Sequence, residues 1–320
     1  MFTDGLISSD DGCSHCPMKL IKIFPILLLF PVVLFAADFP RLKDPIVFQR
    51  TETDRTGKPL IYGKLWIMEA DGSHQRQVSF GTTYDEHPSL YSDQEHVLFG
   101  EFLANGYLPD RGARMVKLNI YTGEREVVAE KFDRALHHAT ISPIDDLIAY
   151  HEDYGERVSQ WIGLGDDAYE IPFRATNGVR TRDGIISMHE KNRSVTPREC
   201  SLIFINTKGG TTQATLLTDE KSLHRRAAVS PDGRWVSWQT NANGTDDEIY
   251  IAKIDGSKPR NLTKTGGQDG HPWFSRDGKW IVFESDRSGN WEIWRMHVDG
   301  SNQEQLTEGK GKYISTRARM

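Results

Sequence analysis

Residues 228–263 read AVSPDGRWVSWQTNANGTDDEIYIAKIDGSKPRNLT, and residues 273–307 read WFSRDGKWIVFESDRSGNWEIWRMHVDGSNQEQLT. The two units carry the same succession of turns and apolar segments. Gly256 and Gly300 hold equivalent places in them, about 44 residues apart, which is the period of a four-stranded propeller blade. The repeat therefore predicts a β-propeller.

The turn chemistry of one unit divides it into four strands. In the sequence Ser-Pro-Asp-Gly at 230–233, proline presets its own φ and glycine accepts a positive φ, so a tight turn is expected. The later turns are quoted from the following unit: a second turn is expected at 286–289 and a third at Asp299–Gly300, with an alternating strand at 291–296 between them. Four strands joined by three turns predict one meandering antiparallel sheet per unit.

Weaker copies of the unit extend towards the N-terminus and give a count of six. The predicted fold is all-β, a six-bladed propeller with four-stranded antiparallel blades. The expected blades are 45–80, 87–130, 138–173, 185–218, 224–263 and 270–308. The first unit lacks a front strand, and we expect the tail 313–320 to supply it, because closure removes an exposed sheet edge. The segment 154–198 shows little alternation and predicts a damaged blade with a long loop.

The N-terminal region has the pattern of a secretory signal peptide at 18–37. Lys19 and Lys22 precede an apolar run at 23–35, and Ala36 and Ala37 are followed by the expected cleavage site. The apolar run has roughly 15 residues, whereas a membrane-spanning helix needs about 20. The alternative is an uncleaved membrane anchor.

The predicted organisation is an over-long N-terminus plus signal at 1–37, followed by the propeller at 38–320. The true start is expected at Met18. We predict a periplasmic or secreted monomer that meets the membrane only through its export signal. The formal charge is −6, and Lys and Arg are spread along the chain, so a nucleic-acid partner is not expected.

The repeats resemble the WD40-like PD40 repeats of the TolB-like propeller family. The matching residues are Ser230-Pro231-Asp232-Gly233, Ser275-Arg276-Asp277-Gly278, Ser285 to Asn290, and the Asp-Gly-Ser triplets at Asp71, Asp255 and Asp299. The resemblance implies a propeller that contacts partner proteins of the cell envelope. Because only about seven residues separate the expected cleavage site from the first strand, we do not expect the small α/β domain that precedes the propeller in TolB. No G-x-S-x-G motif supports a serine peptidase.

Alignment of the units predicts a ring of polar residues. The aligned second-strand aromatics are Phe99, Tyr150, Trp238 and Phe283. Twelve residues before them lie His87, His138, Arg226 and His271. We expect these four at the start of the innermost strands, around one mouth of the central channel. His137 and His224 are further candidates nearby, and His189 belongs to the fourth unit, where the register stays open.

The ring has a structural and a functional interpretation. Each residue could bond only a backbone group of the next blade. Alternatively, the ring forms a concave polar ligand site in which Arg226 holds a carboxylate. His87, His138 and His271 could then bind a divalent transition metal.

Two functions follow from the ligand-site interpretation. The favoured one is an exported TolB-like propeller that binds an envelope protein or a saccharide. The alternative is a metal-dependent polysaccharide lyase or hydrolase, with a site that resembles that of oligogalacturonate lyases and with His138 or His224 as base. Whether the chain is an enzyme stays open, and a binding module is favoured.

Overall fold

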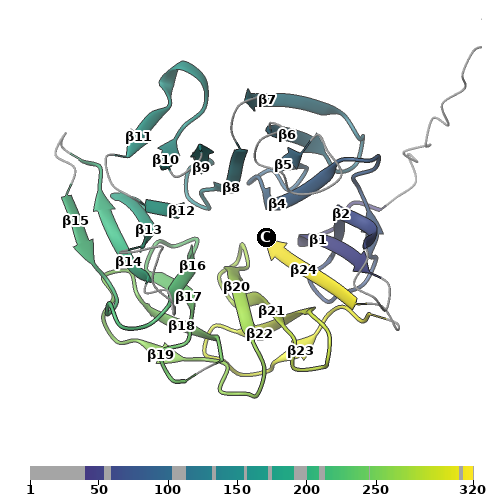
Figure 1. The fold of residues 1–320 in the computed structure, drawn as a ribbon. Coiled ribbons are helices and arrows are strands. Elements are labelled where there is room, and N and C mark those ends of the chain that lie inside the picture. Colours follow the sequence, from purple (N-terminus) through teal and green to yellow (C-terminus); the bar gives the residue numbers. More distant parts are fainter. Residues whose placement is uncertain are drawn as a thin grey trace, which may run out of the picture. The chain divides into compact units, whose positions relative to one another are not determined.

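Six four-stranded antiparallel sheets follow one another around a ring (Figure 1). The computed structural model describes residues 40–53, 59–102, 113–131, 135–154, 157–171, 175–190, 200–208, 213–244, 246–309 and 313–319. No helix in these ranges has the length and apolar character needed to cross a membrane. The all-β, six-bladed prediction is confirmed, whereas the expected signal at 18–37 lies outside the described residues.

Each blade runs in chain order from its innermost to its outermost strand, except the first. Blade 2 contains β4 (Tyr84–Leu90), β5 (His96–Phe102), β6 (Ala113–Asn119) and β7 (Arg125–Lys131); blade 3 contains β8 (Ala135–Ile141), β9 (Ile148–Tyr154), β10 (Arg157–Ile162) and β11 (Tyr169–Ile171); blade 4 contains β12 (Ala175–Arg180), β13 (Gly184–Glu190), β14 (Cys200–Asn206) and β15 (Gln213–Leu216). Blade 5 contains β16 (His224–Val229), β17 (Trp235–Thr240), β18 (Glu248–Lys253) and β19 (Arg260–Asn261); blade 6 contains β20 (Asp269–Phe274), β21 (Trp280–Ser285), β22 (Glu292–His297) and β23 (Glu304–Gln305).

Blade 1 is built from both ends of the propeller. Its strand order is β24 (Tyr313–Arg319), β1 (Pro45–Thr53), β2 (Pro59–Glu69) and β3 (Arg76–Gln77). The last strand, β24, pairs antiparallel with β1 from Val47↔Arg319 to Thr53↔Tyr313. The tail therefore supplies the missing front strand, as the unit count predicts, and β1 has a partner on both sides.

The segment expected to be a damaged blade is regular where the structure describes it. It contains strands β10, β12 and β13, and blade 4 begins at Ala175 instead of residue 185. Buried polar groups hide the strand pattern in the sequence. Gln160 is fully buried; its amide donates to the carbonyl oxygen of Tyr150 at 2.7 Å and accepts from the N–H of Gly178 at 3.0 Å. A polar side chain with such partners replaces the apolar residue that alternation would require.

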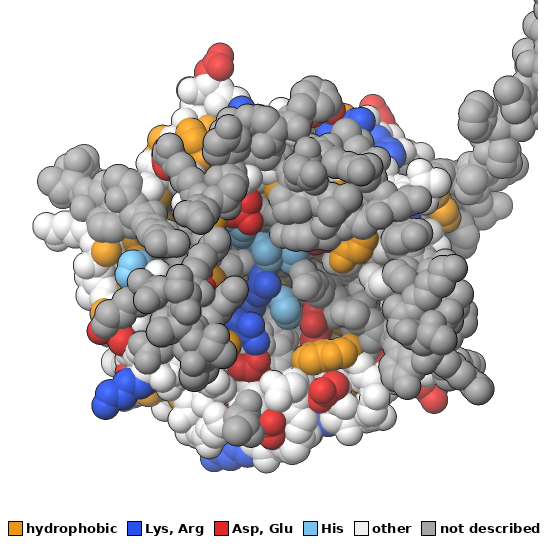
Figure 2. Space-filling model, in the orientation of Figure 1, with side chains coloured by type: hydrophobic (Ala, Val, Ile, Leu, Met, Phe, Trp, Pro, Cys, Tyr) orange, Lys and Arg blue, Asp and Glu red, His pale blue; other side chains and the backbone are white. Residues whose placement is uncertain are grey.

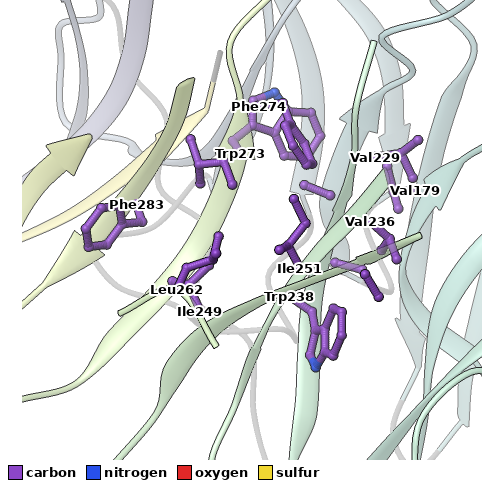
Figure 3. Close-up of a cluster of buried hydrophobic side chains, with 14 of the residues drawn as sticks. Val179, Val229, Val236, Trp238, Ile249, Ile251, Leu262, Trp273, Phe274 and Phe283 are labelled. Carbon is purple, nitrogen blue, oxygen red and sulfur yellow. The ribbon is translucent and has the colours of Figure 1, made fainter. Parts of the chain in front are cut away.

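Apolar side chains pack between neighbouring blades and form the core. The largest such cluster joins blades 4, 5 and 6 (Figure 3). Val179 of β12, Trp238 of β17 and Phe283 of β21 belong to it, and each is at most 4 % exposed. Because the blades share these side chains, the inner strands are held in a defined order around the channel.

Candidate functional site: a polar ring of bulged residues

The inner strands of blades 2 to 6 carry a β-bulge at the same position. In each, two residues oppose one residue of the second strand, and the pairing register shifts there. The first bulged residue has a left-handed backbone. These residues, which we call the bulge ring, are His87 (φ 50°), His138 (φ 49°), Asn177 (φ 52°), Arg226 (φ 55°) and His271 (φ 47°).

The bulge corrects the expected position of the ring residues in their strands and adds a fifth residue to the ring. The aligned residues are equivalent, but they lie at the third or fourth place of their strands and not at the start. The fifth member, Asn177, was missed because the register of the fourth unit was open. The residue type could have indicated this position, because Asn and His adopt the left-handed backbone region more readily than most residues. The left-handed backbone alone therefore accounts for part of the ring's composition, and only the contacts of the ring residues bear on a function.

Blades 2 and 3 meet through a stack of three imidazoles. The ring centroids of His87 and His138 are 3.7 Å apart, and those of His138 and His151 are 4.7 Å apart. The Nδ1 atom of His87 lies 2.9 Å from a carboxylate oxygen of Glu86. His87 is 2 % exposed and His151 is 5 % exposed. This side of the ring is a packed cluster between two blades.

The opposite side of the ring carries the guanidinium. Arg226 donates from Nη1 to the side-chain oxygen of Asn177 at 2.7 Å, which joins blades 5 and 4. The Nδ1 atom of His271 lies 3.3 Å from a carboxylate oxygen of Glu284. Figure 2 shows histidine, basic and acidic side chains gathered near the middle of this face. The channel is therefore lined by groups that recognise polar and charged partners.

The remaining candidates do not join the ring in the same way. His224 is buried at the start of β16, where Trp238 donates its indole N–H to Nδ1 at 3.1 Å. Burial lowers the pKa of His224, although Asp219 at 3.4 Å acts in the opposite direction. His189 lies on the second strand of its blade, opposite Ser201. His137 pairs with His151 through the backbone, and its side chain is outside the described part.

The structure does not assemble the metal-ligand set considered from the sequence. Within the described ranges, no group of three or more His, Cys, Asp or Glu side chains is arranged to hold a metal ion. His87 and His138 pack ring against ring, and His271 lies beside Glu284. What the described geometry offers is hydrogen bonding and charge: imidazoles, one guanidinium and one amide.

Sequence comparisons match part of the chain. The family model for the TolB beta propeller domain, PD40, matches residues 198–319. An uncharacterized protein of Agrobacterium fabrum is 39 % identical over 79 residues, which cover 25 % of this chain and 27 % of that protein. The Tol-Pal system protein TolB of Bordetella pertussis is 41 % identical over 56 residues, covering 17 % of this chain and 13 % of that protein. The matched segments thus span less than a third of either relative.

Structural comparisons extend over most of the chain. TolB from Acinetobacter baumannii has a TM-score of 0.68 at 14 % identity, covering 88 % of this chain and 68 % of that one. An oligogalacturonate lyase in complex with manganese has a TM-score of 0.50 at 15 % identity, covering 78 % and 71 %. At these identities the similarity concerns the fold and carries no site residue from one protein to the other.

Proposed function

We propose that this chain, a β-propeller that resembles TolB, is a protein-binding module of the cell envelope whose bulge ring contacts the partner. The matched relative named as a Tol-Pal system protein supports the envelope setting. The partner's contacting group in this proposal is an acidic side chain.

The observation that carries the proposal is a polar residue at the same bulge of the innermost strand in each of five blades. Buried polar groups cost free energy unless they are satisfied, so ring members of this kind need partners. Neighbouring members touch, as the His87–His138 and Arg226–Asn177 contacts show. A guanidinium and imidazoles grouped in this way suit a carboxylate, because charge-assisted hydrogen bonds are the strong ones.

The test uses immobilised protein and an extract of envelope proteins from the source cells. Wild type, Arg226→Ala and Arg234→Ala are compared. Arg234 is the matched control, because it is exposed on the turn between β16 and β17 and pairs there with Asp232. We expect a partner that wild type and the Arg234 variant retain and the Arg226 variant loses. Equal retention by all three proteins, or retention by none, contradicts the proposal.

Export is part of the same proposal and has its own test. In this proposal residues 18–37 are a signal peptide that is cleaved before Asp38. Fractionation of the source cells should recover the protein with the envelope or the medium, and mass spectrometry should find a mature N-terminus near Asp38. A retained N-terminal segment in the cytosolic fraction contradicts export.

A further inference from the structure

A cavity lies at the ends of the inner strands β4 and β20. It is lined by Leu90 and Phe274, each three residues past a bulge-ring member of the same strand, which corresponds to roughly 10 Å of extended chain. Its volume is about 320 Å³, at the low end of the range for small-molecule sites. Residues of blades 1, 2, 3, 5 and 6 contribute to its walls.

Four aromatic side chains are among the residues that line this cavity, which we call the turn-side cavity. Trp273 and Phe274 come from β20 and are 5 % and 4 % exposed, and Trp280 begins β21. Tyr91 and Leu90 line it from blade 2. Burial raises the pKa of Tyr91 to about 12, so its phenol stays neutral at physiological pH. Flat apolar rings around a small space favour a ligand with an apolar body.

The rim carries one cation whose partners are neutral. Arg276 is exposed, and its guanidinium reaches from blade 6 to the carbonyl oxygen of Ser92 in blade 2. Among the described residues it forms no ion pair. The other guanidinium at the cavity, Arg295, is paired with Glu304 and lies over the Trp280 ring at 4.3 Å.

Asp146 and Asp277, two of the three carboxylates that line the cavity, have partners in the protein. Asp146 accepts hydrogen bonds from the backbone N–H of Ser92 at 3.1 Å and from its hydroxyl. Asp277 accepts from Ser275 at 2.6 Å and lies 3.3 Å from the ammonium of Lys279. Arg276 donates from Nη1 to two neutral oxygens, the carbonyl of Ser92 and the side-chain amide oxygen of Gln94 at 2.6 Å, so its guanidinium has donors and charge left for an anion.

We propose that the turn-side cavity binds a small hydrophobic carboxylate, with the apolar part between Trp273, Phe274 and Tyr91 and the carboxylate on Arg276. The site is separate from the bulge ring and does not depend on the function proposed for that ring. Its specificity comes from two features together, the aromatic walls and the rim cation. An apolar molecule without a charge satisfies only the first of them.

The test measures binding of 3-phenylpropionate and of its neutral analogue 3-phenylpropionamide by isothermal titration calorimetry. Wild-type protein should bind the acid about tenfold more tightly than the amide, which is the fold-change expected from a hydrogen bond to a charged group. Arg276→Gln should remove this preference by weakening the acid alone. Arg276→Lys, which keeps the charge, should restore most of it.

Arg234→Gln is the matched control, an exposed arginine of the equivalent turn in blade 5 that does not line the cavity, and it should bind both compounds as wild type does. Thermal melting of each variant confirms that the fold is retained. The proposal is overturned if acid and amide bind equally to wild type, if neither binds, or if Arg276→Gln leaves the preference intact.

Discussion

Ring closure by β24 predicts that removing residues 313–320 destabilises the whole propeller. The deletion strips seven residue pairs from β1, Val47 to Thr53. An antiparallel ladder supplies on average one hydrogen bond per pair, and each contributes a net ~0.5–1.5 kcal/mol. The expected loss is about 4–10 kcal/mol, compared with the ~5–15 kcal/mol that stabilises a typical domain. The truncated chain should therefore be largely unfolded or associate through the exposed edge of β1.

A circular permutant provides the matched control for this deletion. Arg319 lies opposite Val47, so residues 313–319 followed directly by residues 40–309 would make blade 1 a continuous meander. Residues 40–44 would then form its first turn, equal in length to the turn at 230–234 between β16 and β17. The permutant keeps the strand pairing and changes only the connection, so its free energy of unfolding should stay within ~2 kcal/mol of that of residues 38–320.

Urea unfolding followed by tryptophan fluorescence gives these free energies, and size-exclusion chromatography reports association. If the truncated chain remains monomeric with the midpoint of the parent, β24 contributes little, and the account of closure given above is wrong. If the permutant loses as much free energy of unfolding as the truncated chain, strand pairing alone does not explain the stability of the ring.

Two other predictions concern packing and pH. Gly184→Ala should lower the free energy of unfolding by about 3 kcal/mol, because the added Cβ would lie 2.0 Å from the backbone oxygen of Ile205. Gly266→Ala is the control, since its Cβ meets no atom within 4 Å, and it should be neutral or slightly stabilising. Equal midpoints of urea unfolding for the two variants would contradict this. Burial lowers the pKa of His224 from 6.5, so the folded protein binds fewer protons than the unfolded chain just below pH 6.5, and stability should fall as the pH drops through this range. His224→Gln, whose amide oxygen can still accept from Trp238, should flatten the dependence of unfolding free energy on pH between 7.5 and 5.5, and an unchanged slope would rule out this assignment.

Much of the blade structure was readable from local sequence, and the exceptions have identifiable causes. The turns at 230–233 and 286–289 and the tail strand were located correctly because turn residues and alternation act within a few residues. Strand β12 was missed because Asn177 and Gly178 at its bulge interrupt the alternation of apolar residues within the strand. Asn177 was missed for the same reason, since an unplaced strand cannot reveal its bulge.

The repeat alone determined the four-stranded unit, the count of six, the need for the tail to close the ring and the equivalence of His87, His138, Arg226 and His271. These properties depend on turn chemistry and side-chain periodicity inside one blade. Only the tertiary structure decided which of the equivalent residues touch, as His87 and His138 do. It also decided that Arg276 reaches Ser92, 184 residues away in the chain, over an aromatic cavity. Contacts of this kind depend on closure of the ring, which brings blade 6 to blade 1 and blade 2. No local pattern in the chain encodes a contact between residues so far apart in sequence.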